Sequence, residues 1–237
     1  MIDVYFWPTP NGRKVSIMCE ETGMSEKAGL SYTLKPVDIT RGEQFEPDFL
    51  AISPNNRIPA IVDAHGPGGK PLALFESGAI LEYLAHKSGL LMPKDGRGQW
   101  ITKQWLMFQM GNIGPMWGQQ GHFVIYAPEK VPYAIERYTK EILRLLDVMN
   151  LRLRDAEYLA DEYTIADIAT YPWIATYERR KVSIEEFPHV KRWLDAIAAR
   201  PAVQRGMSWL DDKELRDKPD KEHLAAYFGD QQYQRRS

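Results

Sequence analysis

The feature that most limits the fold is the point at which strand patterns stop. Up to residue 92, short alternating apolar runs take turns with helical runs, whereas every long apolar pattern after residue 99 is helical. The segment between them, PKDGRGQ at 93–99, is polar and contains Gly and Pro, as domain boundaries often do. A β-α-β-α-β-β-α order in so short a stretch implies a small mixed sheet covered by helices.

We therefore predict two domains. An α/β domain covers residues 1–92, a linker covers 93–99 and an all-helical domain covers 100–210. Pro172 should kink one of the helices, because it lacks an N–H and clashes with the preceding turn. The charge-rich segment 211–237 is expected to wrap the surface or fray. Apolar residues at three- and four-residue steps predict the main helices over 99–120, 131–156, 164–181 and 189–201.

Composition argues against several kinds of partner. The chain has 237 residues, a formal net charge of −2 and no long basic run, so we expect no nucleic acid and no anionic membrane surface to be bound by charge. No run approaches the ~20 apolar residues that span a bilayer. The first residues lack the pattern of a secretory signal. We therefore expect a cytoplasmic protein.

Cysteine and histidine usage argues against a disulfide framework and against a metal. Cys19 is the single cysteine, so no disulfide can form within the chain. We interpret it as a small buried apolar residue on the first helix. The five histidines have no metal-ligand spacing with one another or with Cys19, so we expect no metal.

A turn at residues 9–12, Thr-Pro-Asn-Gly, joins the first expected strand to the first expected helix. The start of a helix offers unpaired N–H groups and the positive end of a dipole, which together attract an anion. Thr9 adds a hydroxyl and Asn11 an amide, but neither is a nucleophile without an adjacent base. One interpretation is that both residues stabilise a thiolate carried by a ligand. The other is that Asn11 only caps the helix.

A second helix start lies in LFESGAI, residues 74–80. Ser77 is a natural capping residue, and a free hydroxyl at a helix start also suits a ligand carboxylate. Glu76 could pair with an ammonium group, so the two residues together match the charges of an α-amino-acid end. An ordinary capped helix is the alternative.

Two further motifs concern the backbone. Pro59 in RIPAIVD permits a cis Ile58–Pro59 bond, which would turn the Ile58 main chain outward to pair with an extended peptide. Spacing alone does not establish that bond. In YTIADI, Thr164 and Asp167 fit a capping box at the start of a helix, to which we assign a structural role.

Three motifs in this order, RIPAIVD, FESGAILEYLA and TIADIA, resemble the cytosolic glutathione transferase superfamily. The resemblance implies a thioredoxin-like α/β domain followed by an all-α domain. YFWPTPNGRKV and PYAIERY are similar to the bacterial Nu class, whose members act as glutathione-dependent disulfide-bond reductases. In that class, Thr and Asn of the first turn support the glutathione sulfur in place of a catalytic Tyr, Ser or Cys.

The resemblance gives each candidate residue a role. Thr9 and Asn11 would hold the glutathione thiolate, which would attack a disulfide without help from Cys19. The implied ligands are one or two glutathione molecules or one glutathione disulfide, with no metal, and the implied assembly is a homodimer. The rest of glutathione would be held by Gln44, the main chain of Ile58, Glu76, Ser77 and, from the helical domain, Arg137.

Three alternatives remain open at this stage. The chain could conjugate glutathione to electrophiles, although it lacks a Tyr, Ser or Cys at the first turn. It could remove glutathione from an aromatic conjugate. It could also bind glutathione without catalysis, as a fungal nitrogen regulator of the same superfamily suggests. The sequence does not identify the physiological second substrate.

Overall fold

A mixed sheet forms the centre of the N-terminal domain in the computed structural model, which describes residues 1–23, 30–213 and 219–234. Its four strands lie in the order β2-β1-β3-β4, with β1 parallel to β2 and the other neighbours antiparallel. The predicted fold class is therefore confirmed. The strands are β1 (Ile2–Phe6), β2 (Tyr32–Pro36), β3 (Ala60–Asp63) and β4 (Leu72–Phe75).

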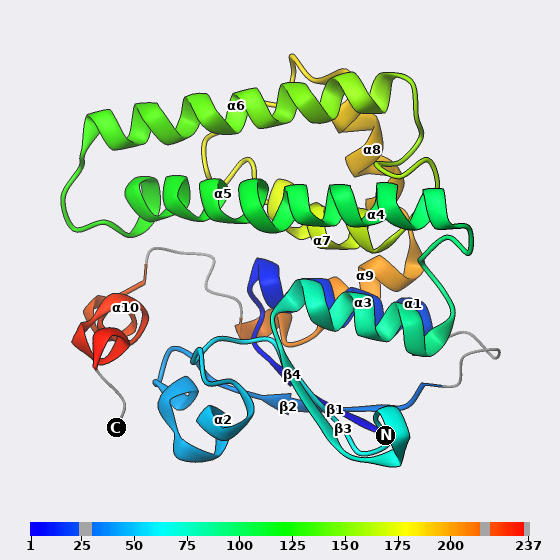
Figure 1. Ribbon diagram of the computed structural model, residues 1–237. Coiled ribbons are helices and arrows are strands. Elements are labelled where there is room, and N and C mark those ends of the chain that lie inside the picture. The colour runs from blue at the N-terminus through cyan, green and yellow to red at the C-terminus, as the bar shows by residue number, and fades with distance from the viewer. Residues whose placement is uncertain (24–29, 214–218, 235–237) are drawn as a thin grey trace.

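Helices α1 (Pro10–Gly23) and α3 (Ser77–Ser88) lie between this sheet and the helical domain (Figure 1). The alternation of β1 explains the arrangement, because Ile2, Val4 and Phe6 are buried in the large core that also contains residues of both helices. A smaller helix, α2 (Pro47–Ile52), follows a 3₁₀ turn at Glu43–Phe45 and contributes Phe49 to a second apolar cluster.

The helical domain is built around one fully buried helix. All ten residues of α7 are buried, and α7 packs against α1, α3 and α4. A π-helical turn at Gln109–Ile113 joins α4 to α5. Helix α7 spans Ile165–Ile174, and the helices around it are α4 (Gly96–Phe108), α5 (Gly114–Gly121), α6 (Pro132–Arg154) and α8 (Pro188–Ala198).

Two boundaries differ from the sequence expectation. Helix α4 begins at Gly96, inside the predicted linker 93–99, because the side chain of Asp95 accepts a hydrogen bond from the N–H of Gly98 at 2.8 Å and caps it. Helix α7 contains Pro172 but ends at Ile174, well short of the predicted residue 181. Residues 175–181 form successive turns, and the Arg180 side chain among them donates to the carbonyl of Trp117 in α5.

The chain returns to the N-terminal domain through a helix that the sequence analysis did not predict. Helix α9 (Pro201–Ser208) packs along α1. The hydroxyl of Ser16 donates to the carbonyl of Gly206 at 2.6 Å, and Arg13 donates to the carbonyl of Trp209 at 2.6 Å. Residues 201–209, assigned by sequence to the helical domain, therefore brace the first helix of the other domain.

Part of the tail packs on the molecule. Helix α10 (Lys221–Phe228), followed by a 3₁₀ turn at Asp230–Tyr233, lies below the end of α5 and to the upper left of α2 (Figure 1). The Phe228 ring contacts the rings of His122 and Tyr126, with centroids 4.7 and 5.5 Å away. Aromatic contacts thus hold this segment against the π-helical turn at His122–Tyr126 that follows α5.

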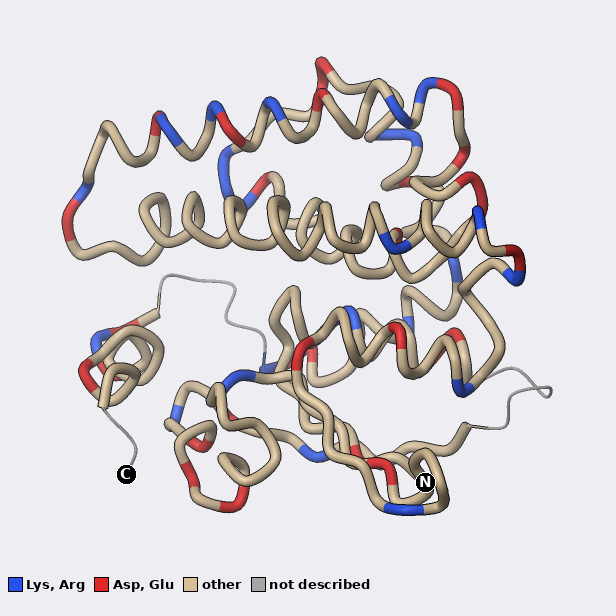
Figure 2. Tube along the Cα trace, viewed as in Figure 1, with Lys and Arg blue, Asp and Glu red and all other residues tan. Residues whose placement is uncertain are grey.

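Charge is distributed unevenly among the helices. Basic and acidic residues alternate along α6, whereas the end of α4 and all of α5 carry none (Figure 2). The charged face of α6 is exposed, whereas the uncharged stretch is partly buried, with Leu106, Ile113 and Trp117 in the core. Within the described ranges, no helix combines the length and the apolar character that crossing a membrane requires.

Candidate functional site

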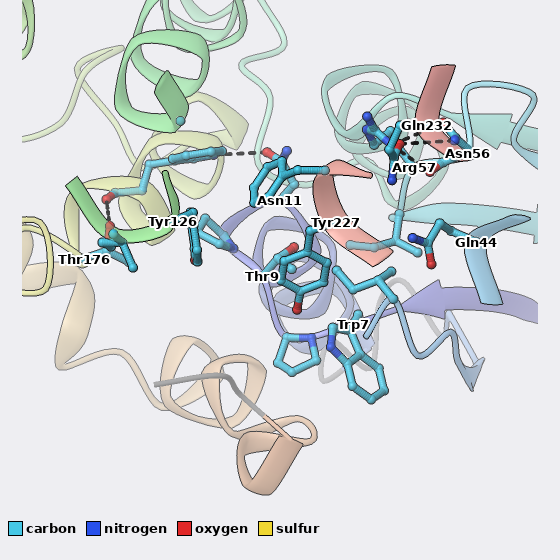
Figure 3. Close-up of a pocket in the computed structure, with 18 of the residues that line it drawn as sticks. Trp7, Thr9, Asn11, Gln44, Asn56, Arg57, Tyr126, Thr176, Tyr227 and Gln232 are labelled. Carbon is cyan, nitrogen blue, oxygen red and sulfur yellow. Dashed lines mark hydrogen bonds between the residues drawn. The ribbon is translucent and has the colours of Figure 1, made fainter. Parts of the chain in front are cut away.

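A cavity of about 350 Å³ opens between the two domains. Its wall combines the β1–α1 junction, residues 56–58, the turn after α5, the end of α7 with the residues that follow it, and the tail. Figure 3 shows side chains from these separate elements directed toward one another. Thr9, Asn11, Gln44 and Ile58, which the sequence analysis singled out, all line this cavity.

Thr9, not Asn11, caps helix α1. The helix begins at Pro10, and the Thr9 hydroxyl oxygen accepts a hydrogen bond from the N–H of Gly12 at 3.2 Å. The alternative that Asn11 is only a cap is therefore wrong. A side chain at position 12 would place its Cβ 2.1 Å from the carbonyl oxygen of Trp7, so the tight turn requires glycine there.

The Asn11 side chain is oriented by a residue from the other domain. Its Oδ1 accepts a hydrogen bond from the indole Nε1 of Trp173 at 3.0 Å (Figure 3). An indole N–H can only donate, so this contact fixes which end of the amide is oxygen. The amide NH₂ of Asn11 is left as a donor. No local sequence pattern reveals this contact, because the two residues are 162 positions apart.

The start of α1 therefore presents donors, and each of its two side-chain oxygens already accepts one hydrogen bond. The oxygen of Thr9 is engaged by Gly12, which leaves the hydroxyl proton, and the oxygen of Asn11 is engaged by Trp173. Among the described residues, no titratable side chain hydrogen-bonds to Thr9 or Asn11 to act as a base. Donors at the positive end of a helix suit an anion, and they do not by themselves create a nucleophile.

Gln44 and Ile58 line the cavity from the α2 side. The Ile58–Pro59 bond is cis, and the Ile58 main chain makes no hydrogen bond to any described residue. Gln44 is buried, and its Nε2 donates to the carbonyl of Ala226 in α10 at 3.3 Å. The tail thus contacts one of the predicted ligand residues directly.

The start of α3 is built differently from the sequence expectation. Ser77 is the first helical residue and Glu76 takes the capping position, so the prediction that Ser77 caps the helix is wrong. Glu76 has φ 72° and ψ 110°, which is strained for a residue with a Cβ, and it makes no side-chain cap. Glu76 is exposed and Ser77 buried, and neither belongs to the cavity wall described above.

A buried lysine supports the α3 start, and the sequence analysis missed it. Lys14 lies on α1, and its Nζ donates to Gln109 Oε1 at 2.7 Å and to Ser77 Oγ at 3.2 Å. Burial lowers the pKa of Lys14 to about 7, although Glu76 opposes the shift. A lysine on a helix normally predicts an exposed side chain. The one available signal is its spacing of three residues from Asn11, which places both on the same side of α1.

Arg137 does not line the cavity of its own chain. It lies on the outer helix α6, is exposed, and its Nη1 is 3.6 Å from Glu141 Oε2 one turn later. The helical spacing of Arg137 and Glu141 explains why the side chain follows its own helix.

Thr164 and Asp167 form a capping box at the start of α7. Asp167 Oδ2 accepts from the N–H of Thr164 at 3.0 Å, and its Oδ1 accepts from Trp193 Nε1 at 2.9 Å. Burial raises the pKa of Asp167 to about 6, against the effect of these hydrogen bonds. The pair joins α7 to α8 and does not belong to the cavity wall.

The tail supplies part of the cavity wall. Tyr227, Phe228, Gln232 and Tyr233 line it, and Gln232 Oε1 accepts hydrogen bonds from Asn56 and Arg57. The sequence analysis expected a surface segment here. The missed signal is a pair of adjacent aromatic residues at 227–228 within an otherwise charged stretch.

Cys19 lies away from this chemistry. It is buried in the core of the N-terminal domain, and burial raises the pKa of its thiol well above the ordinary value, so the thiol stays protonated. Within the part of the chain that the structure describes, no group of three or more His, Cys, Asp or Glu side chains is arranged to hold a metal ion.

Comparison with protein families identifies both domains. Residues 6–86 match the glutathione S-transferase N-terminal domain, and residues 119–201 match the glutathione S-transferase C-terminal domain. Among curated proteins, the Escherichia coli K12 disulfide-bond oxidoreductase YfcG is 50% identical over 210 residues, which cover 87% of this chain and 94% of that protein. The E. coli disulfide-bond oxidoreductase YghU is 40% identical, with 86% and 73% covered.

Solved structures give the same result. A glutathione transferase from Pseudomonas putida, with one glutathione disulfide bound per subunit, matches with a TM-score of 0.83 and 46% identity, covering 88% of this chain and 91% of that one. A glutathione transferase from Burkholderia graminis, with two glutathione molecules bound per subunit, matches with a TM-score of 0.83 and 49% identity, covering 88% of both chains.

Proposed function

Because this chain belongs to the glutathione transferase family, we propose that it is a glutathione-dependent disulfide reductase whose reactive sulfur comes from bound glutathione. One observation carries the proposal. At the start of α1, the Thr9 and Asn11 oxygens each accept a hydrogen bond from the protein, while the Thr9 hydroxyl hydrogen and the Asn11 NH₂ donate to no described residue and are available to a ligand. Donors at a helix start lower the pKa of a thiol because they stabilise its thiolate.

The reaction then consists of two thiol–disulfide exchanges. The glutathione thiolate attacks one sulfur of the substrate disulfide, forms a mixed disulfide and releases the other half as a thiolate. A second glutathione thiolate attacks the glutathione sulfur of the mixed disulfide. This step yields glutathione disulfide and the second substrate thiol after protonation. The protein stabilises the first thiolate. Its own Cys19 takes no part in the exchange, because that thiol is buried and protonated.

The remaining predicted residues fit the other groups of glutathione. The unpaired main chain of Ile58 suits the cysteinyl backbone, and Gln44 lies on the same side of the cavity. The uncapped start of α3 suits the γ-glutamyl carboxylate, and the exposed carboxylate of Glu76 suits its ammonium. Lys14 donates to the Ser77 oxygen, and the Ser77 hydroxyl donates to the Met110 sulfur at 3.8 Å, a weak acceptor that a ligand carboxylate can replace.

We further propose that each subunit holds one glutathione disulfide, as in the solved structure of the P. putida protein, or two glutathione molecules, as in that of the B. graminis protein. We propose a homodimer as well. Arg137 is exposed and remote from its own cavity, so any contact with glutathione would require a second subunit. A cytoplasmic location follows from the use of glutathione as the reductant.

The test is turnover of 2-hydroxyethyl disulfide with glutathione, beside conjugation of glutathione to a nitroaromatic halide. We expect the wild type to reduce the disulfide far faster than it conjugates. Asn11→Ala should lower kcat/KM for the disulfide by ~10-fold or more, because it removes a donor to the thiolate. Asn112→Ala, on the π-helical turn and outside the cavity wall, is the matched control.

Each alternative function predicts a different result. Faster conjugation than reduction would assign the chain to the conjugating transferases. Tight glutathione binding with no turnover of either substrate would favour a regulatory role or a dedicated conjugate as substrate. Equal loss of activity in Asn11→Ala and Asn112→Ala would remove Asn11 from the mechanism.

A further inference from the structure

Two adjacent arginines follow α7 and line the helical-domain wall of the cavity. Arg180 is buried, with 8% of its surface exposed. Arg179 is partly exposed, but its Nη2 atom is buried and has no hydrogen-bond partner in the part of the chain that the structure describes. The sequence motifs assign neither residue a role.

The fold holds the Arg180 guanidinium in place with uncharged groups. Its Nε donates to Thr176 Oγ1 at 2.8 Å, and its Nη1 donates to the carbonyl of Trp117. The guanidinium lies 5.5 Å from the ring centre of Trp173. Gly121 leaves the space that this requires, because a Cβ there would lie 1.9 Å from Arg180 Nη1. The cation is therefore positioned without being neutralised.

Neither arginine has a carboxylate partner. Across residues 1–23, 30–213 and 219–234, no Asp or Glu lies within ion-pair distance of Arg179 or Arg180. Other arginines differ, since Arg144 and Arg200 pair with Glu141 and Glu21 at 2.7 and 2.8 Å. The neighbouring stretch 104–128 contains no Asp, Glu, Lys or Arg (Figure 2).

The charge of Arg180 persists near neutral pH. Burial lowers its pKa to about 10, a shift that Arg179 reinforces and Tyr126 opposes. Tyr227 of α10 is a further neighbour, and its pKa is raised by burial, Tyr126 and Asp38 and lowered by Arg179. Asp38 is itself engaged, because its Oδ1 accepts from the N–H of Thr40 at 2.9 Å. A buried guanidinium without a counterion favours an anion from solution.

We propose that Arg179 and Arg180 form an anion subsite that binds a carboxylate of the substrate disulfide, so that the enzyme prefers small acidic disulfides to neutral ones. This inference rests on the proposed reductase function. Trp173 sets the spacing, since its indole N–H contacts Asn11 and its ring lies beneath Arg180. One side chain thus separates the thiolate position from the cation, which suits a carboxylate only a few bonds from the reacting sulfur.

The experiment compares 3,3′-dithiodipropionate with its neutral dimethyl ester, both with glutathione as reductant. We expect the wild type to favour the acid by about tenfold or more in kcat/KM, mainly through KM. Arg179→Gln should lower that ratio by about tenfold, and Arg179→Lys should restore part of it. Arg144→Gln, on the exposed face of α6, is the matched control and should leave the ratio unchanged. Arg180→Gln is a second variant, with its folding checked by thermal unfolding.

A binding measurement separates this inference from the proposed function. Calorimetric titration of 3,3′-dithiodipropionate into the wild type and Arg179→Gln requires no turnover, and the variant should bind about tenfold more weakly. If the wild type reduces neither disulfide, the proposed function fails while the binding difference still tests the subsite. Equal affinity in both proteins, or no preference for the acid over the ester, would overturn the subsite.

Discussion

Helices α1 and α3 both begin after a strand, and we assign both helix starts to the same ligand. Lys14 of α1 connects them, because its side chain reaches Ser77 at the start of α3. The N–H groups at the two helix starts are nevertheless satisfied in different ways. At α1, the Thr9 side chain caps the helix. At α3, the capping position is taken by Glu76 with φ 72°, and no side chain caps the helix.

The difference separates two ways of preparing a helix start for an anion. The α1 start is stable by itself, because its cap is made, and its specificity comes from which ends of Thr9 and Asn11 remain free. The α3 start is costly, since it combines backbone strain at Glu76 with burial of the Lys14 amine, which lowers the pKa of that group. Uncapped N–H groups and a strained backbone lower the stability of the unliganded protein. They are expected at a position that serves ligand binding and not folding.

The largest effect should come from the charge at the α3 start. Glu76→Gln should weaken glutathione binding by ~30-fold, or about 2 kcal/mol, because it replaces a charge-assisted hydrogen bond to the ligand ammonium by a neutral one. Titration calorimetry measures this directly. Glu82→Gln, two turns later on α3, removes an ion pair to Lys103 and is the control. Similar affinities in the two variants would show that the α3 start does not bind the γ-glutamyl end.

Lys14, which supports the α3 start, should make the free energy of unfolding depend on pH. Its pKa of about 7 in the folded protein lies below the value of ~10.4 for an unfolded lysine. Between these values the unfolded chain binds the extra proton, so the contribution of Lys14 to the free energy of unfolding rises with pH, by up to about 1.4 kcal/mol per unit. This contribution is lost again as pH falls through 7.

Lys14→Met should abolish that slope. Urea unfolding at pH 7, 8 and 9 measures the free energy of unfolding of both proteins. The value for the variant minus that for the wild type should fall by about 2 kcal/mol between pH 7 and 9. The difference between the two free energies cancels the contributions of titratable groups that both proteins contain, including Cys19. Lys140→Met, on the exposed face of α6, should show no such trend. A parallel pH profile for Lys14→Met and wild type would mean that Lys14 stays charged when buried.

Trp173 offers a sharper test of the α1 start. Trp173→Phe keeps an aromatic ring but removes the donor to Asn11 Oδ1, so the amide is free to turn its oxygen toward the thiolate. We expect kcat/KM to fall about fivefold, corresponding to ~1 kcal/mol for one net hydrogen bond. The thiol pKa of bound glutathione, followed by thiolate absorbance, should rise. Trp100→Phe, at an exposed position, is the control, and an unchanged thiol pKa in Trp173→Phe would contradict this role.

The smallest effect concerns strain. Glu76→Gly should raise the free energy of unfolding by ~0.5–1 kcal/mol, because relief of an unfavourable φ outweighs the added entropy of the unfolded chain. The same variant should bind glutathione poorly. Ala79→Gly in the first turn of α3 should instead destabilise by ~1 kcal/mol. A loss of stability in both glycine variants would show that the Glu76 backbone is not strained.

Local patterns predicted a large share of this molecule. The alternation of β1 and the stepped apolar residues of α6 gave the right elements, and the RIPAIVD motif drew attention to the Ile58–Pro59 bond. These features depend on residues close together in the chain. The length of α7 was overestimated, since the residues after Ile174 continue a helical pattern but are used as turns.

The parts of the site that the sequence did not reveal all depend on distant residues. Trp173 orients Asn11 from 162 positions away, and Lys14 meets Gln109 across 95. The tail aromatics reach the cavity only because α10 returns beside α5. No periodicity records such contacts, because each involves one residue on each element.

By itself, the sequence determined the order of elements, the two-domain division and the residue types at both helix starts, because these follow from short-range propensity and apolar spacing. The tertiary structure decided which atoms of those residues remain available. Thr9 and Asn11 present donors, Ser77 accepts from a buried lysine, and Arg179 and Arg180 have no carboxylate partner among the residues that the structure describes. The physical reason is that hydrogen-bond partnership and charge compensation depend on three-dimensional proximity, which packing of the two domains alone establishes.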